Sequence, residues 1–342
     1  MLLIVPPGGR ENDGVPPPPA VSAVRGAVRR LLGSAEAAPF RGAPLVVACS
    51  GGADSLALAA AASHAARHAG VALRAVVVDH GLQVGSADVA ARAAQQLTGL
   101  GAVAEVVTVQ VDGPGGPEAA ARRARYRVLR EKRPPGSLVL LGHTLDDQAE
   151  TVLLGLGRGS GARSISGMRP VDPPWARPFL GVRRETTEAA CRELGLEPWR
   201  DPHNADARFT RVRLRTEVLP LMEDVLQGGV HEALARTAQQ LREDADALDA
   251  LAAAERRRVA AGDGLDALAL KEIPAALRRR VVRAWLLDRG VPEVTDAHLR
   301  AADALVSDWR GQGGPRLPGD FVLSRAHGTL QVGGAGRKPP NG

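Results

Sequence analysis

Between residues 45 and 156 the apolar residues fall into short continuous runs, and Ala-rich helical stretches separate these runs. The runs predict strands at 45–49 (LVVAC), 73–79 (LRAVVVD), 104–111 (AEVVTVQV) and 137–142 (SLVLLG). The stretches between and after them predict helices at 55–69, 86–100, 117–132 and 146–156. Strands that are apolar throughout are buried on both faces, so the alternation predicts an α/β fold with a parallel sheet flanked by helices. Ligands of such sheets bind at the carboxyl ends of the strands.

The pattern becomes irregular over 198–222 and purely helical after residue 230. Helices are predicted at 230–261, 274–289 and 295–308, and the segment RLPGDFVLSRAHGTLQV alternates around turn residues as a hairpin does. The chain is therefore expected to have four parts. They are a flexible Pro/Gly-rich tail at 1–22, an α/β domain at 23–225, an all-helical domain at 226–310, and a short β-hairpin with a flexible C-terminal tail at 311–342.

Composition adds an expectation about partners. Basic residues outnumber acidic ones by 44 to 38, and all but three of the basic residues are arginines. A guanidinium suits phosphate, so the excess is consistent with an RNA or nucleotide partner, although a biased composition explains it equally well. Four Trp, four Phe and one Tyr are too few for a module that binds RNA by base stacking.

Other function classes are excluded by what the chain lacks. No uncharged apolar run reaches the roughly 18 residues that a membrane span needs, so no membrane partner is expected. The start, MLLIVPPGGR, has no basic residue ahead of its short apolar run and does not fit a secretory signal, so a cytoplasmic location is expected. Cys49 and Cys191 form no CxxC motif, which argues against a disulfide framework and a cysteine metal site.

The sharpest motif is SGGADS, placed between the first predicted strand and the first predicted helix. A strand that turns through glycines into a helix presents free backbone N–H groups to an anion, which predicts a phosphate site. An acidic residue beside phosphate implies a divalent cation between them, so Mg²⁺ is expected at Asp54. The alternative is a tight turn with a serine N-cap. The predicted phosphate-binding residues are Ser50, Gly51, Gly52, Ala53, Asp54 and Ser55.

The motif lacks the GxxxxGK[ST] form of kinases and GTPases and resembles the PP-loop of the N-type ATP pyrophosphatases. Four further segments follow in order: VDHGL at 78–82, EAAARRARY at 118–126, GHTLDDQAET at 142–151 with RGSG at 158–161, and WRDPHN at 199–204 with four arginines after it. Together, over about residues 45–222, they are similar to the tRNA(Ile)-lysidine synthetase family. The resemblance implies a PP-loop catalytic domain at 23–225 and a helical tRNA-binding domain at 226–310.

The same resemblance implies an activity and its partners. In that family, ATP activates C2 of the wobble cytidine in a tRNA(Ile) with a CAU anticodon, and L-lysine then displaces AMP to form lysidine. The modified tRNA pairs with AUA instead of AUG. ATP as substrate, Mg²⁺, tRNA(Ile) and lysine are the implied ligands, and a homodimer is left open.

Three predicted site residues end strands of the sheet. Asp79 and His80 follow the strand next to the loop strand, where a nucleoside of ATP would lie, although an aspartate there also serves as a helix cap. His143 ends the fourth predicted strand on the same edge. It is expected to orient the cytidine or the AMP leaving group, with a structural core histidine as the alternative.

Acidic residues at helical spacing supply the remaining chemistry. Asp146 and Asp147 are expected to take part in metal ligation and lysine ammonium binding, with helix capping as the alternative, and Glu150 is undecided. Asp54 and Asp147 are the predicted metal pair. Arg211 is expected to stabilise the charge that develops on phosphorus, or else to clamp a phosphate.

Two basic clusters and one basic helix are expected to bind the RNA backbone. Arginines at 211, 213 and 215 alternate with apolar residues and would point one way in an extended segment. A solvated helix face and ordinary helix packing are the alternatives. The expected tRNA-binding residues are Arg122, Arg123, Arg125, Arg208, Arg213, Arg215, Arg279 and Arg283.

Two other functions fit parts of the sequence. A tRNA cytidine 2-thiolase uses the same loop on the same base, but it needs cysteine pairs that this chain lacks. A universal-stress-type protein holds ATP in a similar sheet without turnover, but it needs neither Asp54 nor the DDQxET run. The sequence therefore favours the ligase.

Overall fold

A computed structural model describes residues 16–334 except 82, 84, 113–115, 160, 202–205 and 207, and it leaves the side chains of 117 and 118 undescribed. Most of the two predicted tails, and His203 and Asn204 of the WRDPHN motif, lie outside the described residues. The chain divides into two compact units. One contains the chain up to Arg158 and Gly167–Ala238, and the other contains Gly159–Ser166 and the chain from Gln239 onward.

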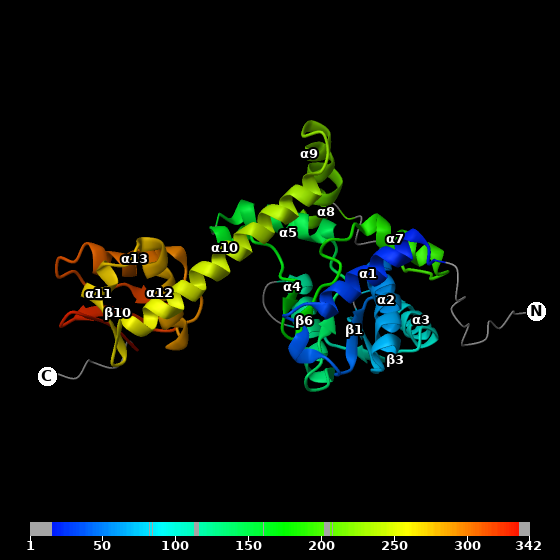
Figure 1. The fold of residues 1–342 in the computed structure, drawn as a ribbon, viewed down its shortest axis with the longest axis horizontal. Coiled ribbons are helices and arrows are strands. Elements are labelled where there is room, and N and C mark those ends of the chain that lie inside the picture. The colour runs from blue at the N-terminus through cyan, green and yellow to red at the C-terminus, as the bar shows by residue number, and fades with distance from the viewer. Residues whose placement is uncertain are drawn as a thin grey trace, which may run out of the picture. The chain divides into compact units, whose positions relative to one another are not determined.

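The first unit is built on a six-stranded sheet with the order β3-β2-β1-β4-β6-β5 (Figure 1). All neighbouring strands are parallel except the pair at the β5 edge. The predicted parallel sheet is confirmed, although its third and fourth strands are shorter than expected. The strands are β1 (Leu45–Cys49), β2 (Leu73–Asp79), β3 (Val103–Thr108), β4 (Val139–Leu140), β5 (Val171–Asp172) and β6 (Trp175–Ala176).

Helices cover both faces of this sheet because successive residues of a strand point to opposite sides. Val47 packs in the larger core with helices α1, α2, α3 and α7, whereas Val46 packs in the smaller core against Val128 and Leu129 of α4. The predicted α/β architecture is therefore confirmed. The helices are α1 (Pro19–Gly33), α2 (Ala53–Ala69), α3 (Ser86–Gly99), α4 (Gly116–Lys132), α5 (Leu145–Arg158) and α7 (Arg184–Glu193).

Three segments of this unit differ from the prediction. Helix α1 starts at Pro19, inside the predicted tail at 1–22, because a proline is favourable in the first turn and one helix face, including Val24 and Val28, is buried. Helix α7 was not predicted. The region expected to be irregular contains a continuous helical segment formed by α8 (Thr210–Arg213), the π-helical turn η3 (Leu214–Val218) and α9 (Leu219–Val225).

The second unit confirms the predicted helices and hairpin but not their separation into 226–310 and 311–342. Its five-stranded sheet, with the order β7-β8-β11-β10-β9, shares one core with the helices, since Leu323 and Leu330 are buried with Trp285 and Leu305. The unit that was expected to be helical therefore also contains a small sheet. The elements are α6 (Ala162–Ile165), most of α10 (Val230–Arg258), β7 (Ala260–Ala261), β8 (Gly264–Asp266), α11 (Ala267–Lys271), α12 (Ala275–Asp288), α13 (Asp296–Ser307), β9 (Arg316–Leu317), β10 (Phe321–Ala326) and β11 (Thr329–Gly334).

The division between the units falls within α10, after Ala238, and not at the predicted boundary of 225 and 226. The first turns of α10 belong to the first unit because Val230 is buried there with Ala149 and Leu219. Within the described part of the chain, every helix is too short or too polar to cross a bilayer.

Candidate active site

The SGGADS motif forms the loop between β1 and α2. Gly51 has a φ of +82°, a conformation that side chains disfavour, and its carbonyl accepts a 2.9 Å hydrogen bond from the Trp199 N–H. Gly52 is the N-cap of α2. The N–H groups of Gly52, Ala53 and Asp54 donate to no acceptor within the described residues. The loop thus presents three backbone donors at a helix N-terminus, as an anion site requires.

The two loop serines differ in their surroundings. Ser50 is exposed, whereas the Ser55 side chain is buried and its hydroxyl is used inside the loop. The Ser55 Oγ accepts from the Ser50 N–H at 3.2 Å and donates to the Gly52 carbonyl at 2.9 Å. Ser55 therefore stabilises the loop conformation, and its predicted direct contact with phosphate stays a prediction.

Arg184, at the start of α7, joins the loop to α5. Its Nε lies 3.3 Å from Asp54 Oδ2, and its Nη2 donates to Asp147 Oδ1 at 2.8 Å. The other Asp54 oxygen accepts from the Thr187 hydroxyl one turn along α7. Neither Arg184 nor Thr187 was predicted from the sequence. The Arg-Arg pair that opens an amphipathic stretch at 183–193 was the available signal.

The two bridged carboxylates respond differently to burial. Burial outweighs the Arg184 guanidinium and the Thr187 hydroxyl and raises the pKa of Asp54. Burial also acts to raise the pKa of Asp147, but the guanidinium of Arg184 and the Thr144 N–H overcome it, and the pKa is lowered. That N–H donates to Asp147 Oδ2 at 2.8 Å. The environment therefore favours the ionised form at Asp147 and disfavours it at Asp54.

Asp146 lies beside Asp147 but serves a different element. Its Oδ2 accepts a 2.8 Å hydrogen bond from the backbone N–H of Arg184, so it caps the first turn of α7. Its Oδ1 lies 3.6 Å from Arg183 Nη2 and 3.8 Å from His231 Nε2. Capping, which the sequence left as an alternative for this residue, is the contact observed.

Glu150 is fully buried one turn further along α5, and burial raises its pKa although Arg215 opposes the shift. Arg215 binds Glu150 Oε1 at 2.7 Å, and Arg211 Nη1 lies 3.5 Å from Oε2. Arg213 points elsewhere and pairs with Glu217 at 2.8 Å. The expectation that 211, 213 and 215 point one way is wrong because the segment is helical, and residues four apart share a face.

Guanidinium groups already pair with the carboxylates of this cluster. Four carboxylates face four guanidinium groups, and both oxygens of Asp54 and of Asp147 already accept hydrogen bonds. No group of three His, Cys, Asp or Glu side chains within the described residues is arranged to hold a metal. The predicted pair Asp54 and Asp147 therefore does not fit Mg²⁺ as arranged. The paired groups are Asp54, Asp146, Asp147 and Glu150 with Arg183, Arg184, Arg211 and Arg215.

The histidines at the same sheet edge lie in a cationic environment. The Nδ1 atoms of His80 and His143 are buried and have no hydrogen-bond partner in the described structure. Burial lowers the pKa of both, to about 3 for His143, where Asp147 opposes the shift and the guanidinium groups of Arg125 and Arg177 add to it. Arg125 and Arg177 are thus close enough to His143 to act on its charge, and Arg177, which was not predicted, follows β6.

We expect the His143 imidazole to stay neutral between pH 5 and 8, because its pKa of about 3 lies below that range. Histidine side-chain NMR on labelled protein, assigned with a His143→Gln variant, measures this directly. Titration of His143 near pH 6.5 would show that the buried environment is wrong.

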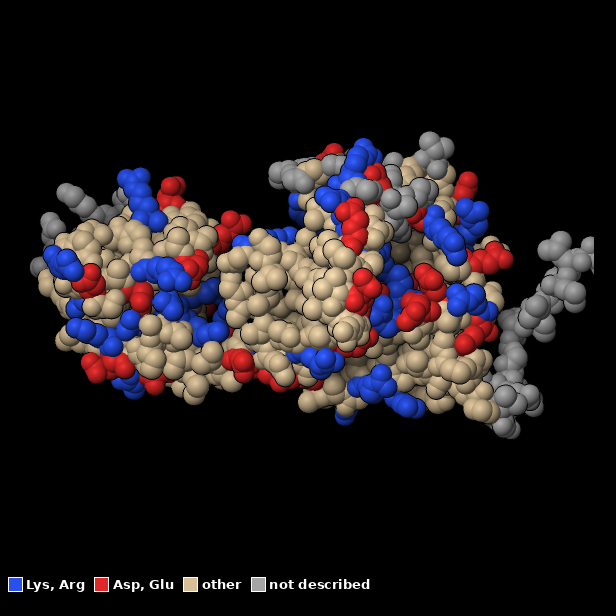
Figure 2. All heavy atoms as spheres, turned by 90° about the horizontal axis from the view of Figure 1, so that it is seen from above, with Lys and Arg blue, Asp and Glu red and all other residues tan. Residues whose placement is uncertain are grey.

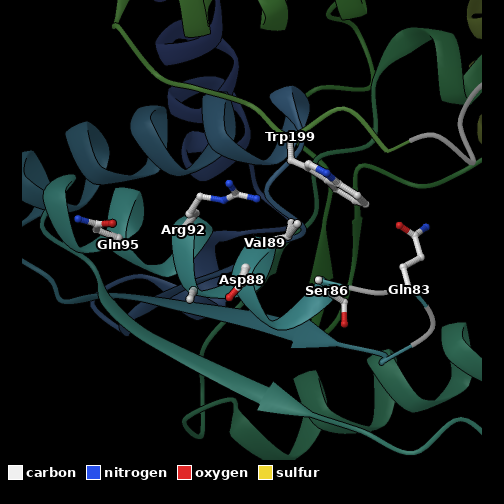
Figure 3. Close-up of a pocket in the computed structure, with 9 residues that line it drawn as sticks. Gln83, Ser86, Asp88, Val89, Arg92, Gln95 and Trp199 are labelled. Carbon is white, nitrogen blue, oxygen red and sulfur yellow. The ribbon is translucent and has the colours of Figure 1, made fainter.

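Asp79 is buried, and its carboxylate accepts a 3.0 Å hydrogen bond from the Gly81 N–H. The bond closes a turn after β2 and caps no helix, because α3 begins only at Ser86. A cavity of about 560 Å³ lies beside the loop, and the Trp199 indole projects over the first turns of α3 opposite Val89 and Arg92 (Figure 3). The cavity is lined by Gln83, Gly85, Ser86, Asp88, Val89, Ala91, Arg92, Gln95 and Trp199.

The other predicted tRNA-binding arginines are distributed over both units. Arg122 stacks on Tyr126 at 4.8 Å, Arg123 is exposed, and Arg208 pairs with Asp206 at 2.6 Å. Figure 2 shows basic and acidic side chains interspersed on the face in view. In the second unit Arg279 is half-buried and Arg283 lines a cavity of about 590 Å³. Its other basic lining residues are Arg163, Arg256, Arg257 and Arg280.

Both cysteines are buried and free. Burial raises the pKa of Cys49, and it raises the pKa of Cys191 to about 12. Neither forms a thiolate at neutral pH, so neither supplies a nucleophile or a metal ligand.

Comparison with known families matches both units. Residues 27–222 match the family described as a PP-loop domain, and residues 265–331 match the TilS substrate binding domain. The chain is 60% identical over 296 residues to the tRNA(Ile)-lysidine synthase of Mycobacterium leprae, which covers 84% of this chain and 90% of the relative. It is 57% identical over 322 residues to the enzyme of the same name from Nocardia farcinica, covering 92% of this chain and 99% of the relative.

A solved structure supports the fold of the first unit. The U34-tRNA thiolase NcsA of Methanococcus maripaludis, with its [4Fe-4S] cluster, aligns with a TM-score of 0.54 at 18% identity, over 66% of this chain and 79% of that chain. At this identity the likeness concerns the fold alone.

Proposed function

The chain belongs to the tRNA(Ile)-lysidine synthase family, and from this premise we propose how its residues ligate L-lysine to C2 of the wobble cytidine in CAU-anticodon tRNA(Ile). It is a PP-loop ligase with ATP as substrate and AMP and pyrophosphate as products. The modification changes codon reading from AUG to AUA.

One observation carries the assignment of roles. The phosphate loop and a cluster of carboxylates lie at the same edge of the sheet, and Arg184 bonds to both. A site for the phosphates of ATP and a site for the ammonium of lysine therefore lie next to each other. A reaction that uses both substrates requires this arrangement. A protein that only stores ATP needs the first site and not the second.

In the first step the loop N–H groups of Gly52, Ala53 and Asp54 hold the departing diphosphate. The cytidine O2 attacks the α-phosphorus, an O2–P bond forms, and the bond from that phosphorus to the bridging oxygen breaks. Arg211 is partly exposed, and its 3.5 Å contact with Glu150 is longer than the 2.7 Å contact of Arg215. Arg211 supplies the cation for the charge that develops on phosphorus.

In the second step a lysine amine, after its ammonium has lost a proton to solvent, attacks C2. A C2–N bond forms and the C2–O bond to AMP breaks. Asp146 holds the start of α7 with its Oδ2, and its Oδ1, whose contacts with Arg183 and His231 are long at 3.6 and 3.8 Å, accepts the lysine ammonium that does not react. His143, neutral and with a buried unpartnered Nδ1, orients the cytidine. No step is assigned to Mg²⁺, which we propose arrives bound to ATP.

The thiolase alternative is not favoured, because the two cysteines are buried and their thiol pKa values are raised. We place the reaction in the cytoplasm, where its tRNA substrate is found, and leave the homodimer as a prediction.

The proposal is tested by incubating the purified protein with labelled ATP, lysine and unmodified CAU-anticodon tRNA(Ile). AMP and pyrophosphate should appear together only when tRNA is present, and labelled lysine should enter the tRNA. Pyrophosphate release that ignores the tRNA, or incorporation of another amino acid at the same rate, would overturn it. A tRNA(Met) with the same anticodon is the control for RNA selection.

The exposed arginines lead to a prediction about salt. Removing Arg213 should lower the dependence of log K on log[salt] by about one unit, because one phosphate contact is lost. Binding of tRNA measured between low and physiological salt gives this slope. Arg67→Ala, at the far end of α2 from the loop, is the matched control and should leave the slope unchanged. Equal slopes for both variants would locate the RNA elsewhere.

A further inference from the structure

Arg184 occupies the position between Asp54 and Asp147 where the sequence predicts a metal ion. Its Nε is 3.3 Å from Asp54 Oδ2, and its Nη2 is 2.8 Å from Asp147 Oδ1. The three side chains are only 15–24% exposed, so the contacts are partly shielded from water. A divalent ion that bound both carboxylates would have to displace the guanidinium.

The remaining carboxylate oxygens are also engaged. Asp54 Oδ1 accepts from the Thr187 hydroxyl, and Asp147 Oδ2 accepts from the Thr144 N–H at 2.8 Å and its hydroxyl at 3.1 Å. A Mg²⁺ ion requires near-octahedral oxygen ligation, which this arrangement does not leave open. Within the described residues no third acidic or imidazole group completes a metal site.

The pairing of charges leads to the same conclusion. Each carboxylate of the cluster already has an arginine partner among Arg183, Arg184, Arg211 and Arg215, and Arg183 also lies 3.6 Å from Glu232. A divalent cation would add positive charge beside guanidinium groups in a partly buried site, which is unfavourable. Exchanging it for Arg184 would leave the guanidinium without partners.

Arg184 also connects three elements through one residue. Its side chain bonds to α2 and α5, and its backbone N–H donates to Asp146 at 2.8 Å. A planar guanidinium reaches two carboxylates at once, which fixes the distance between the loop carboxylate and the one on α5. Misplacing either would separate the phosphate site from the amine site.

We infer that Arg184, and not a protein-bound metal ion, is the resident cation between Asp54 and Asp147, and that it is a positioning residue that holds the PP-loop in register with α5. The ATP-free protein accordingly has no divalent-ion site at this pair. This inference concerns the protein before any substrate binds and does not depend on which nucleotide or RNA it uses.

The test is Mn²⁺ binding to the ATP-free protein. Binding is measured as the decrease of the electron paramagnetic resonance signal of free Mn²⁺. Wild type should leave the signal unchanged. Arg184→Met, which keeps the stem but removes the charge, should gain one Mn²⁺ site at least about tenfold tighter than any in wild type, because two carboxylates lose their cation. Asp147→Asn in the Arg184→Met background should abolish that site.

Two further variants keep the result interpretable. Arg184→Lys retains a cation and should bind no Mn²⁺, while partly restoring the turnover that Arg184→Met loses. Arg192→Met, at the exposed far end of the same helix, should match wild type in both measurements. Stoichiometric Mn²⁺ binding by wild type that disappears in Asp147→Asn would overturn the inference. Arg184 is intact in both of these proteins, so the comparison does not depend on the folding of an Arg184 variant. Arg184→Met that folds, as judged by circular dichroism, and gains no site would overturn it as well.

Discussion

Asp54→Ala is expected to reduce adenylation by about 10³-fold or more while changing tRNA affinity by only a few fold. The carboxylate is the acidic side chain of the loop, and it anchors both Arg184 and Thr187 there. Without it, the guanidinium loses one of its two anchors beside the incoming triphosphate, and the reacting groups lose their alignment. The side chain lies inside the site and contacts no exposed arginine of the predicted RNA-binding clusters.

Tests of this prediction need two separate measurements. Formation of AMP and pyrophosphate with saturating tRNA and lysine gives the catalytic loss, and filter binding without ATP gives the RNA affinity. Thr187→Val, which removes one hydrogen bond to Asp54 and keeps the carboxylate, should show a smaller loss. If Asp54→Ala weakened RNA binding as much as adenylation, its role would be structural.

Arg215→Met is expected to destabilise the first unit by about 3 kcal/mol, because it leaves the fully buried Glu150 without its main partner. Arg211 lies 3.5 Å from the second oxygen and compensates only in part. The reverse change, Glu150→Gln, should be milder, since Arg215 and Arg211 are partly exposed and can turn toward water. Urea unfolding followed by circular dichroism measures both.

The Arg215→Met effect should also grow with pH. The pKa of Glu150 is already raised above its ordinary 4.5 by burial, and Arg215 is the main group that opposes this shift. Without the arginine the folded-state pKa rises further, so the folded protein binds a proton that the unfolded chain has released. Stability therefore falls as pH rises from the unfolded-state pKa through the folded-state pKa. The loss should be larger at pH 8 than at pH 5, and Arg213→Met, which removes a surface pair, should show no such change. A pH-independent loss would show that Glu150 stays ionised on its own.

The sheet was predictable because the signals for its strands are local. Continuous apolar runs define β1 and β2, and the motif between the first strand and helix defines the loop. The end of each strand then places Asp79, His80 and His143 on one edge without any knowledge of packing. Helix α1 was missed because its Pro/Ala start follows a proline-rich segment, which locally resembles a linker.

The partners of the carboxylates were not predictable in the same way. Asp54 and Arg184 are 130 positions apart, and nothing in either neighbourhood specifies the other. The arginines after residue 208 were misjudged for a different reason. Over a few residues, alternation of Arg with Val and Leu fits an extended segment, but the pair Arg211 and Arg215 also fits one face of a helix. Only the buried Glu150 beside that face decides between the two.

The π-helical turn after α8 has a consequence for comparing sequences. Its Leu219 N–H donates to the Leu214 carbonyl, so the turn holds one residue more than an α-helical turn would. Arg211 is fixed ahead of it by Glu150, and Leu219 is fixed after it by the core. Deleting one residue would rotate the two ends by about 100° relative to each other. Homologues that keep this turn should therefore have the same number of residues between the positions of Arg211 and Leu219. A sequence alignment with a gap in this segment would pair the wrong arginines.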